Sequence, residues 1–294
     1  WSKCPDGYAV LGLGAVHLQE KDSFGPVTAA NQDVMKFECS DLGCRAYCWG
    51  ATCDVHVRCG KISKASMDVK NGAAITSAKD RWGAMATCPA GYVAVGLAKI
   101  ELLGGAAGQN QDVRDFECSS GGCRAWCLGS DCTVQSRCAK VAGHTLDVAS
   151  GSKVSGSAGQ WSVYSTCAPG YAVVGMSRVG LTAAVASSGQ DVSDFECNSK
   201  GCRAFCAGSA CDVVAMCMLV DGTLGSLLTS NSNYGEFVLQ TDIPTLMNGD
   251  YLGSIDHDVS VRLRVIAKAG TSITAVDEGS AESLRVGVGK SSVL

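Results

Sequence analysis

Hydrophobic positions in this chain form short runs that glycine interrupts, and they do not recur at helical spacing over long stretches. Glycine is frequent, at 36 of 294 residues, and turn-forming residues return every 8–12 residues. This punctuation is typical of short strands. Three similar apolar runs predict buried strands that stop at a glycine: 8–11 before Gly12, 92–95 before Gly96, and 171–174 before Gly175.

The region 257–267 shows the clearest period-two alternation. Its apolar positions would share one face of a strand, with serine and arginine on the other, a pattern that indicates a half-buried strand. We expect this strand to serve in assembly; its apolar residues are Val259, Val261, Leu263 and Val265. Further strands are predicted at 236–240, 272–276 and 284–288.

Cysteine spacing divides most of the chain into three repeats. The pattern C-x4-C-x3-C-x4-C-x5-C occurs at 37–59, 116–138 and 195–217, and each copy has a sixth cysteine upstream. An even number at constant spacing predicts a disulfide framework in an oxidising compartment. Six cysteines allow fifteen connectivities, which spacing does not distinguish. The framework comprises Cys4, Cys39, Cys44, Cys48, Cys53 and Cys59, then Cys88, Cys118, Cys123, Cys127, Cys132 and Cys138, then Cys167, Cys197, Cys202, Cys206, Cys211 and Cys217.

The predicted fold is mainly β: three tandem disulfide-stabilised small modules followed by a cysteine-free, strand-rich C-terminal segment. The predicted boundaries are 1–79, 80–158, 159–232 and 233–294. One short helix per module is an alternative, since Cys44 and Cys48 would share a face of a helical turn. The modules could form a rod or close into a pseudo-threefold body, and both arrangements stay open.

Composition narrows the possible partners. The net charge is −4 without a basic run, which argues against nucleic acid, and no apolar run reaches the length of a membrane span. Only 18% of residues are charged, against about 25% in typical domains. A chain with so little surface charge tends to bury its surface against something, such as copies of itself. The chain begins at Trp1, and we expect a mature, processed extracellular protein.

A set of polar residues recurs in every repeat and is the candidate for a site present three times. It could bind carbohydrate or a cation; the alternative is an internal Glu–Arg ion pair with an aspartate-stabilised turn. An aromatic position, occupied by Tyr47, Trp126 and Phe205, could stack on sugars or fill the core. The polar set is Asp33, Asp112 and Asp191, Glu38, Glu117 and Glu196, and Arg45, Arg124 and Arg203.

Neither a metal site nor an enzyme is expected. The cysteines lack the paired C-x2-C of zinc sites, and the sequence contains no G-x-S-x-G, H-E-x-x-H or phosphate-binding loop. We therefore predict no catalytic residues and no cofactor.

The opening of the chain resembles a known class of repeats. Trp1, Cys4, Gly7, Tyr8 and Gly12 match the W-x-x-C-x-x-G-Y-x-x-x-G opening of extracellular cysteine-rich tandem-repeat proteins from aquatic eukaryotes. The resemblance covers a short part of each module, and modules 2 and 3 use W-x5-C instead. It implies a cell-surface or matrix location and no particular activity.

These observations predict a secreted structural protein that self-associates head to tail into an extracellular filament or surface layer. The tail of one subunit would pack on, or add a strand to, the head of the next; the alternative is a tail that forms its own small β-domain. The second functional hypothesis is a multivalent carbohydrate-binding adhesin with one weak site per repeat.

Overall fold

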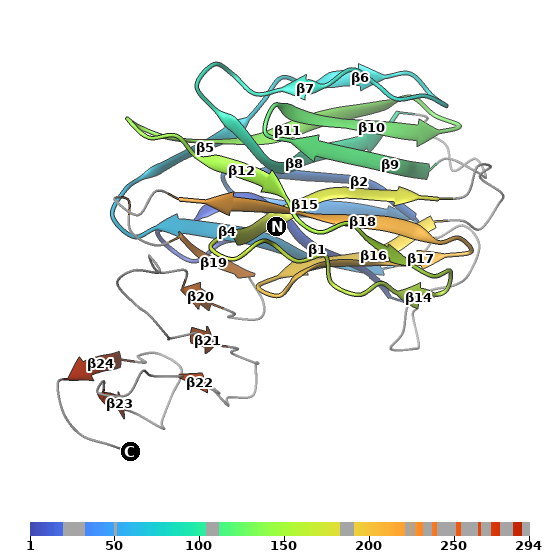
Figure 1. Cartoon of the computed structure of the whole chain (residues 1–294). Helices are drawn as coiled ribbons and strands as arrows, with labels where there is room; N and C mark the ends of the chain where they lie inside the picture. The colour runs from blue at the N-terminus through green and yellow to red at the C-terminus, as the bar shows by residue number, and fades with distance from the viewer. Residues whose placement is uncertain are drawn as a thin grey trace.

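The structure is a computed structural model, and it is mainly β (Figure 1). It contains no α-helix among the residues that it describes. Those residues are 1–19, 33–49, 52–103, 112–182, 191–220, 224, 227–231, 237–239, 251–253, 264–265, 272–276 and 285–289.

Three sheets form the body of the molecule, and we number them 1 to 3. Sheet 1 runs in the order β14 (Gln160–Trp161), β17 (Gly201–Ala207), β16 (Asp191–Asn198), β1 (Ala9–Gln19), β4 (Thr52–Ile62) and β19 (Leu227–Asn231). Sheet 2 runs in the order β3 (Gly43–Trp49), β2 (Asp33–Ser40), β8 (Val93–Leu102), β11 (Cys132–Val141) and β5 (Met67–Asn71), with β6 (Ile75–Ser77) also pairing with β11. Sheet 3 runs in the order β12 (Asp147–Ser150), β18 (Cys211–Leu219), β15 (Ala172–Leu181), β9 (Asp112–Ser119), β10 (Gly122–Leu128) and β7 (Ala86–Thr87), with β13 (Val154–Gly156) also pairing with β18.

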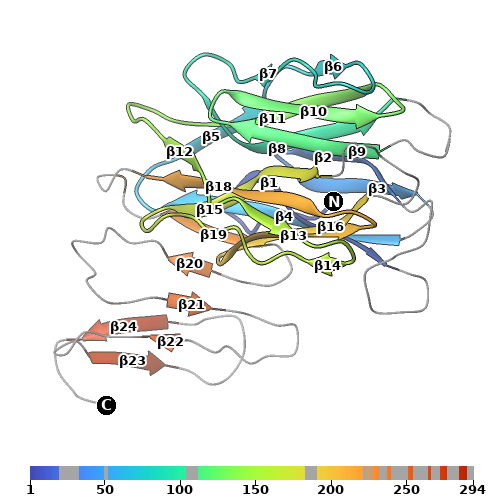
Figure 2. The ribbon, with the colours of Figure 1, turned by 45° about the vertical axis from the view of Figure 1, so that its right-hand side comes forward.

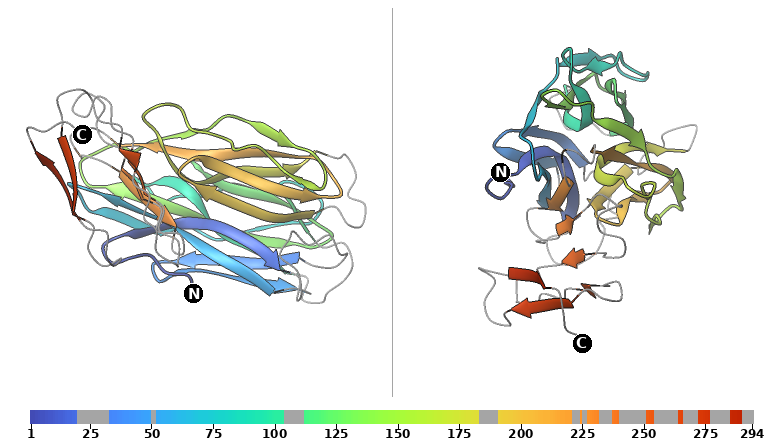
Figure 3. Two further views of the ribbon diagram at one scale, coloured as in Figure 1. Left: turned by 90° about the horizontal axis from the view of Figure 1, so that it is seen from below. Right: turned by 60° about the vertical axis from the view of Figure 1, so that its left-hand side comes forward.

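Each sheet combines strands from two sequence repeats. The first long strand of one repeat pairs with the central hairpin of the repeat before it and, on its other side, with the last long strand of its own repeat; repeat 1 receives the hairpin of repeat 3. This last pairing closes the three sheets around a common centre, as the right-hand view of Figure 3 shows. The recurring phenylalanine marks the same register in each sheet: Phe37 lies opposite Ile100, Phe116 opposite Val179, and Phe195 opposite Val16.

The sequence allowed either a rod or a closed pseudo-threefold body, and the structure has the closed arrangement. One hydrophobic core contains residues from all three repeats, including Leu11, Val95 and Val174, which are fully buried. The boundaries 1–79, 80–158 and 159–232 delimit the repeat of the sequence; as domain boundaries they stay a prediction.

The central strands β1, β8 and β15 contact one another at this centre, and glycine allows the close approach. A Cβ atom on Gly96 would lie 3.2 Å from the carbonyl oxygen of Leu11, and one on Gly12 would lie 3.4 Å from that of Leu97. The prediction that strands stop at Gly12, Gly96 and Gly175 is wrong: β1, β8 and β15 run through these positions, with a register shift beside each glycine. The glycines mark strand bulges at the packed centre, not turns.

The disulfide pairing is the same in all three repeats: first with sixth, second with third, and fourth with fifth cysteine. The first pair joins the segment before the central strand to the last long strand, and the second spans the hairpin. The third joins strands of different sheets, since Cys48 lies in β3 of sheet 2 and Cys53 in β4 of sheet 1. The pairs are Cys4–Cys59, Cys39–Cys44 and Cys48–Cys53; Cys88–Cys138, Cys118–Cys123 and Cys127–Cys132; and Cys167–Cys217, Cys197–Cys202 and Cys206–Cys211.

The alternative of a helical turn at Cys44–Cys48 is wrong, because both cysteines lie in β3. Cys44 is directly opposite Cys39 on the paired strand β2, so the short C-x4-C spacing is that of a hairpin. All eighteen cysteines are paired, and none is free.

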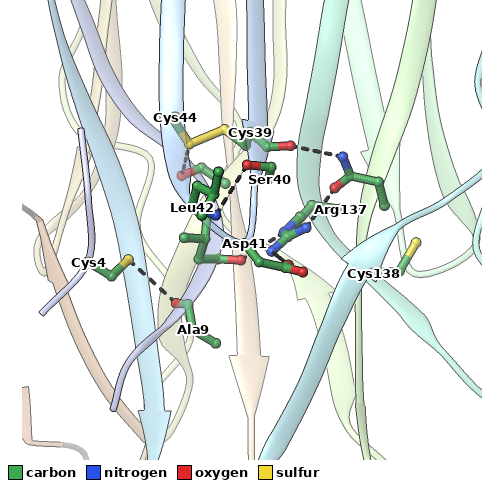
Figure 4. A network of polar contacts seen from close by, with 12 residues as sticks. Cys4, Ala9, Cys39, Ser40, Asp41, Leu42, Cys44, Arg137 and Cys138 are labelled. Carbon is green, nitrogen blue, oxygen red and sulfur yellow. Dashed lines mark hydrogen bonds and ion pairs between the residues drawn. A yellow bond between two sulfur atoms is a disulfide. The ribbon is translucent and has the colours of Figure 1, made fainter. Parts of the chain in front are cut away.

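Two arginines are buried between the sheets, each 1% exposed. Arg137 of β11 donates hydrogen bonds to the carbonyl oxygen of Val10 in β1 (2.9 Å), to Oδ1 of Asn71 in β5 (2.7 Å) and to Oδ1 of Asp41 (2.7 Å). Figure 4 shows Arg137 beside Asp41, at the turn that the Cys39–Cys44 disulfide closes. Arg58 of β4 similarly donates to the carbonyl oxygen of Val173 in β15 (2.8 Å), so both guanidinium groups join neighbouring sheets.

Beyond β19 the described strands pair with β19 or with one another, and in Figures 1 and 2 they extend away from the three-sheet body. They are β20 (Phe237–Leu239), β21 (Tyr251–Gly253), β22 (Arg264–Val265), β23 (Ser272–Val276) and β24 (Arg285–Gly289). Strands were predicted close to β20, β23 and β24. Of the predicted assembly strand, Val265 lies in β22, whereas Val259, Val261 and Leu263 lie outside the described residues.

Candidate functional site

The glutamates and arginines of the polar repeat form one cross-strand ion pair in every hairpin. Arg45 lies opposite Glu38, and its Nε donates to Glu38 Oε1 over 2.6 Å. The same bond, at the same distance, joins Arg124 to Glu117 and Arg203 to Glu196. Asp33, Asp112 and Asp191 are the first residues of β2, β9 and β16, and their side chains lie outside the described part of the structure.

A tryptophan stacks on each of these arginines. The guanidinium carbon lies 4.5 Å from the ring centroid of Trp1 for Arg45, 4.8 Å from that of Trp82 for Arg124, and 4.6 Å from that of Trp161 for Arg203. Arg203 also stacks on Tyr164, at 4.8 Å. Each guanidinium therefore has a carboxylate at its edge and an aromatic ring on its face. Sequence reasoning did not include the three tryptophans in the site, although their recurrence near the start of each repeat was visible.

In repeats 2 and 3 the segment that carries this tryptophan covers the outer edge of the hairpin. The amide groups of Asp80 and Gly83 donate to the carbonyl oxygens of Cys127 and Ala125 in β10, over 2.8 and 3.0 Å. The equivalent edge, on β17, accepts from Gly159 and Ser162 in the same way. As a result Ala125, Cys127, Ala204 and Cys206 are each 0% exposed.

The edge of β3 in repeat 1 is different. Ser2 pairs with Cys44 at the start of the strand, but no described residue bonds to the outer edge of β3 beyond that point. Ala46 and Cys48, the equivalents of the covered alanines and cysteines, are only partly buried. The Arg45 side chain is 54% exposed, against 37% for Arg124 and 32% for Arg203. A strand position that is filled twice in this body is therefore not filled by any described residue beside β3.

Apolar side chains accompany this uncovered edge. Tyr47 in β3 is 56% exposed, whereas Phe205 at the same position of β17 is 5% exposed. Leu42, in the turn before β3, is 68% exposed, and Trp1 is 48% exposed. We call the outer edge of β3 with these three side chains the β3 edge. An unpaired strand edge with apolar side chains is a template for pairing with another strand.

Sheet 1 carries a group of titratable residues where the other sheets carry fixed ion pairs. Arg178 and Lys99 lie opposite Glu117 and Glu38 and form ion pairs with Asp115 and Glu101, but Ala15 lies opposite Glu196. In sheet 1 the basic side chain near Glu196 is His17. Its Nε2 lies 3.8 Å from Glu196 Oε2, and its Nδ1 lies 3.9 Å from Asp194 Oδ1. Burial lowers the pKa of His17 and of the neighbouring His56.

Burial has the opposite effect on the pKa of Asp194, a carboxyl group in the same cluster. It raises the pKa of Asp194 from 3.8 to about 6, although the amide of Leu18 donates to Asp194 Oδ1 over 2.7 Å. Burial and a 2.6 Å hydrogen bond to Glu196 raise the pKa of Tyr164 to about 12. Burial therefore disfavours both the ionised Asp194 and the protonated His17.

We expect Asp194→Asn to stabilise the protein above pH 6, because asparagine can accept the Leu18 bond without a buried charge. An acid whose folded pKa is raised destabilises the folded state progressively as the pH rises from about 4 to about 6. The difference in free energy of unfolding between variant and wild type should therefore approach about 3 kcal/mol at pH 7.5 and vanish near pH 4. Urea denaturation at several pH values measures it. A difference independent of pH would contradict this account. His17 and His56 are present in both proteins, so their own titration does not account for a difference between the two.

Among the residues described, no group of three or more histidine, cysteine or acidic side chains could hold a metal ion. No helix with the length and hydrophobicity to cross a membrane is found in that part of the chain.

Two surface features therefore stand out. The Glu–Arg–Trp groups occur in all three repeats, and the β3 edge distinguishes repeat 1 from repeats 2 and 3. In each Glu–Arg–Trp group, the glutamate and the tryptophan ring already contact the guanidinium of the arginine. At the β3 edge, the carbonyl oxygens of Ala46 and Cys48 have no described partner strand, and of the three apolar side chains Trp1 stacks on Arg45. Comparisons of the chain with protein-family models, with curated proteins and with solved structures find no match.

Proposed function

We propose that this chain is a secreted structural protein that self-associates through the β3 edge into an extracellular filament or surface layer. The observation that carries the proposal is the difference between β3 and its two equivalents, β10 and β17, whose outer edges are covered by a strand. The nine disulfides fit an extracellular protein. The low proportion of charged residues, 18%, also favours association.

Tyr47→Lys tests this proposal. A lysine in the middle of an exposed edge strand opposes pairing, because the charge would have to be buried by the incoming strand. Since Tyr47 is exposed, the variant should fold normally. We expect the protein concentration needed for assembly to rise at least about tenfold, which corresponds to about 1.4 kcal/mol. Light scattering and negative-stain microscopy of the full chain measure this.

Val163→Lys is the matched control, because Val163 is an apolar residue with 69% exposure in the segment beside β17 of sheet 1, whereas β3 lies in sheet 2. This variant should assemble like the wild type. Equal assembly of Tyr47→Lys and wild type, or a wild type that stays monomeric at all concentrations, would reject the proposal.

Multivalent glycan binding is the second candidate, and the threefold recurrence of a tryptophan stacked on an arginine favours it. Aromatic rings beside charged groups are common in sugar recognition, and three weak sites on one body would add avidity. Binding of the monomeric chain to a glycan array, lost in Trp1→Ala, would support this candidate.

A further inference from the structure

The three repeats form a closed ring, and no disulfide spans the joint at which the ring closes. Each disulfide joins two cysteines of the same repeat. The chain itself connects repeat 1 to repeat 2 and repeat 2 to repeat 3. Repeats 1 and 3 meet through the pairing of β1 with β16, through β19 beside β4, and through the bond from Arg58 to the Val173 carbonyl oxygen. We call the pairing of β1 with β16 the closing joint, and the described contacts that hold it are noncovalent.

The two other joints between repeats contain cations that stay charged throughout the physiological pH range. Where β2 pairs with β8, Lys36 Nζ lies 2.9 Å from Glu101 Oε1. Where β9 pairs with β15, Arg178 Nη2 lies 2.8 Å from Asp115 Oδ2. At the closing joint the hairpin supplies the acid, Asp194, and the residue opposite it is His17. The closing joint therefore has a titratable base where the other two have a permanent cation.

Titratable groups of both neighbouring strands face His17. From β16, Glu196 and Asp194 place carboxylate oxygens 3.8 and 3.9 Å from its two ring nitrogens. From β4, Asp54 lies opposite His17, and the ring centroid of His56 is 5.9 Å from that of His17. His56 itself is 5% exposed. Two histidines thus share one half-buried cluster.

The surroundings hold both histidines in the neutral form. Burial is the largest influence on the pKa of each ring and lowers it. Glu196 acts in the opposite direction, but its Oε1 already accepts bonds from Arg203 of β17 and from the Tyr164 hydroxyl, each over 2.6 Å. Arg203 also lowers the pKa of His17, and the nearby His17 lowers that of His56. A proton on either ring is therefore unfavourable while the joint is closed.

We propose that the closing joint is an acid-sensitive switch, in which His17 and His56 take up protons when the pairing of β1 with β16 opens. In the open joint both rings regain water, and their positive charges are no longer buried side by side. Opening therefore binds protons, and a fall in pH shifts the equilibrium towards the open joint. The strands of the other two joints, β2 with β8 and β9 with β15, contain no histidine.

Asp194 acts against the two histidines. Burial raises its pKa to about 6, so the closed joint binds a proton that the open joint releases. Between pH 7.5 and 5.5 this favours the closed joint by about fourfold. Over the same range each histidine, with an ordinary pKa of 6.5, can favour the open joint by up to about tenfold. Removing the Asp194 carboxyl group should therefore expose the full effect of the histidines.

The other two joints are internal controls because their acids respond differently. Burial raises the pKa of Asp115 to about 6, so a fall in pH favours the closed pairing of β9 with β15. The pKa values of Glu38 and Glu101 are lowered from 4.5. The pairing of β2 with β8 should therefore be insensitive to pH above about 5.5.

Hydrogen exchange of the full chain under non-reducing conditions tests the inference. Mass spectrometry at pH 7.5 and 5.5, corrected for the pH dependence of the chemical exchange rate, gives the equilibrium constant for opening of each joint. In Asp194→Asn we expect the opening constant of the β1 and β16 amides to rise at least about tenfold at the lower pH. In the wild type the rise should be about fourfold smaller, and neither control joint should show one. No rise in Asp194→Asn, or an equal rise at all three joints, would overturn the inference.

A second variant separates titration from packing. Adding His17→Gln to Asp194→Asn should reduce the pH-dependent rise at least about twofold, because glutamine has no proton to gain. Lost packing alone would raise opening equally at both pH values and leave their ratio unchanged, and an unchanged ratio would overturn the role of His17. The measurement concerns contacts within one chain, so its outcome is independent of self-association through the β3 edge.

Discussion

Replacing Arg137 with alanine should lower the free energy of unfolding by about 3–5 kcal/mol, the usual range when one partner of a buried charged network is removed. The side chain is 1% exposed and joins sheet 2 to the Val10 carbonyl oxygen of sheet 1, as well as to Asn71 and Asp41. Alanine would leave these acceptors without their donor, and it would also leave a cavity where the long aliphatic part of the arginine was packed. Urea denaturation under non-reducing conditions measures the loss.

The chain itself supplies the control, because Met216 holds the equivalent position of β18 and is also 1% exposed. Arg137→Met should fill the space and lose only the hydrogen bonds, at about 1–3 kcal/mol. Asp41→Asn should cost less than about 1 kcal/mol, since the Asp41 side chain is 79% exposed. Equal losses for the alanine and methionine variants would show that packing contributes little, and a loss below 1 kcal/mol for alanine would contradict the role of Arg137 between the sheets.

The second large effect concerns the disulfides, whose sequence separations differ tenfold within one repeat. Cys88–Cys138 spans 50 residues and Cys118–Cys123 spans 5. If a disulfide stabilises mainly by restricting the unfolded chain, removing the first should cost about 4 kcal/mol and removing the second about 2 kcal/mol. The test replaces both cysteines of a pair with alanine, so that no free thiol remains.

Cys118, Cys123 and Cys138 are buried and Cys88 is half-buried, so the packing loss should be no larger for Cys88–Cys138, and a greater cost there reports the loop term. Denaturation midpoints and slopes of the two double variants give the two free energies. Equal costs would contradict the loop-entropy account and indicate that native packing around the sulfurs decides the stabilisation.

Local patterns in the sequence predicted much of the secondary structure. Turn-forming residues between short apolar runs indicated strands, and 272–276 coincides with β23. The even cysteine count indicated complete pairing, which the structure confirms. The Glu–Arg pair of each hairpin was also foreseen, as the structural alternative to a ligand site. Each of these features depends on residues that are near one another in the chain, or on composition.

Contacts between distant residues were not predictable in the same way. Gly12, Gly96 and Gly175 were interpreted as strand ends because a glycine in sequence looks the same in a turn and in a packed bulge. Only the neighbouring strands show which of the two it is. The burial of Arg58 and Arg137 was likewise not expected, since their acceptors Val173 and Val10 lie 115 and 127 residues away. The β3 edge became visible only by comparison with β10 and β17 in their sheets.

The sequence alone thus determined that this protein is a threefold repeat of short, disulfide-linked strands with a cysteine-free end, because repeat length, strand periodicity and cysteine number are local properties of the chain. The tertiary structure decided which cysteines pair, that each hairpin crosses to the sheet of the next repeat, and which hairpin edge no described residue covers. These features depend on how the three repeats pack against one another, and the similar local sequences of the three repeats are compatible with several such arrangements.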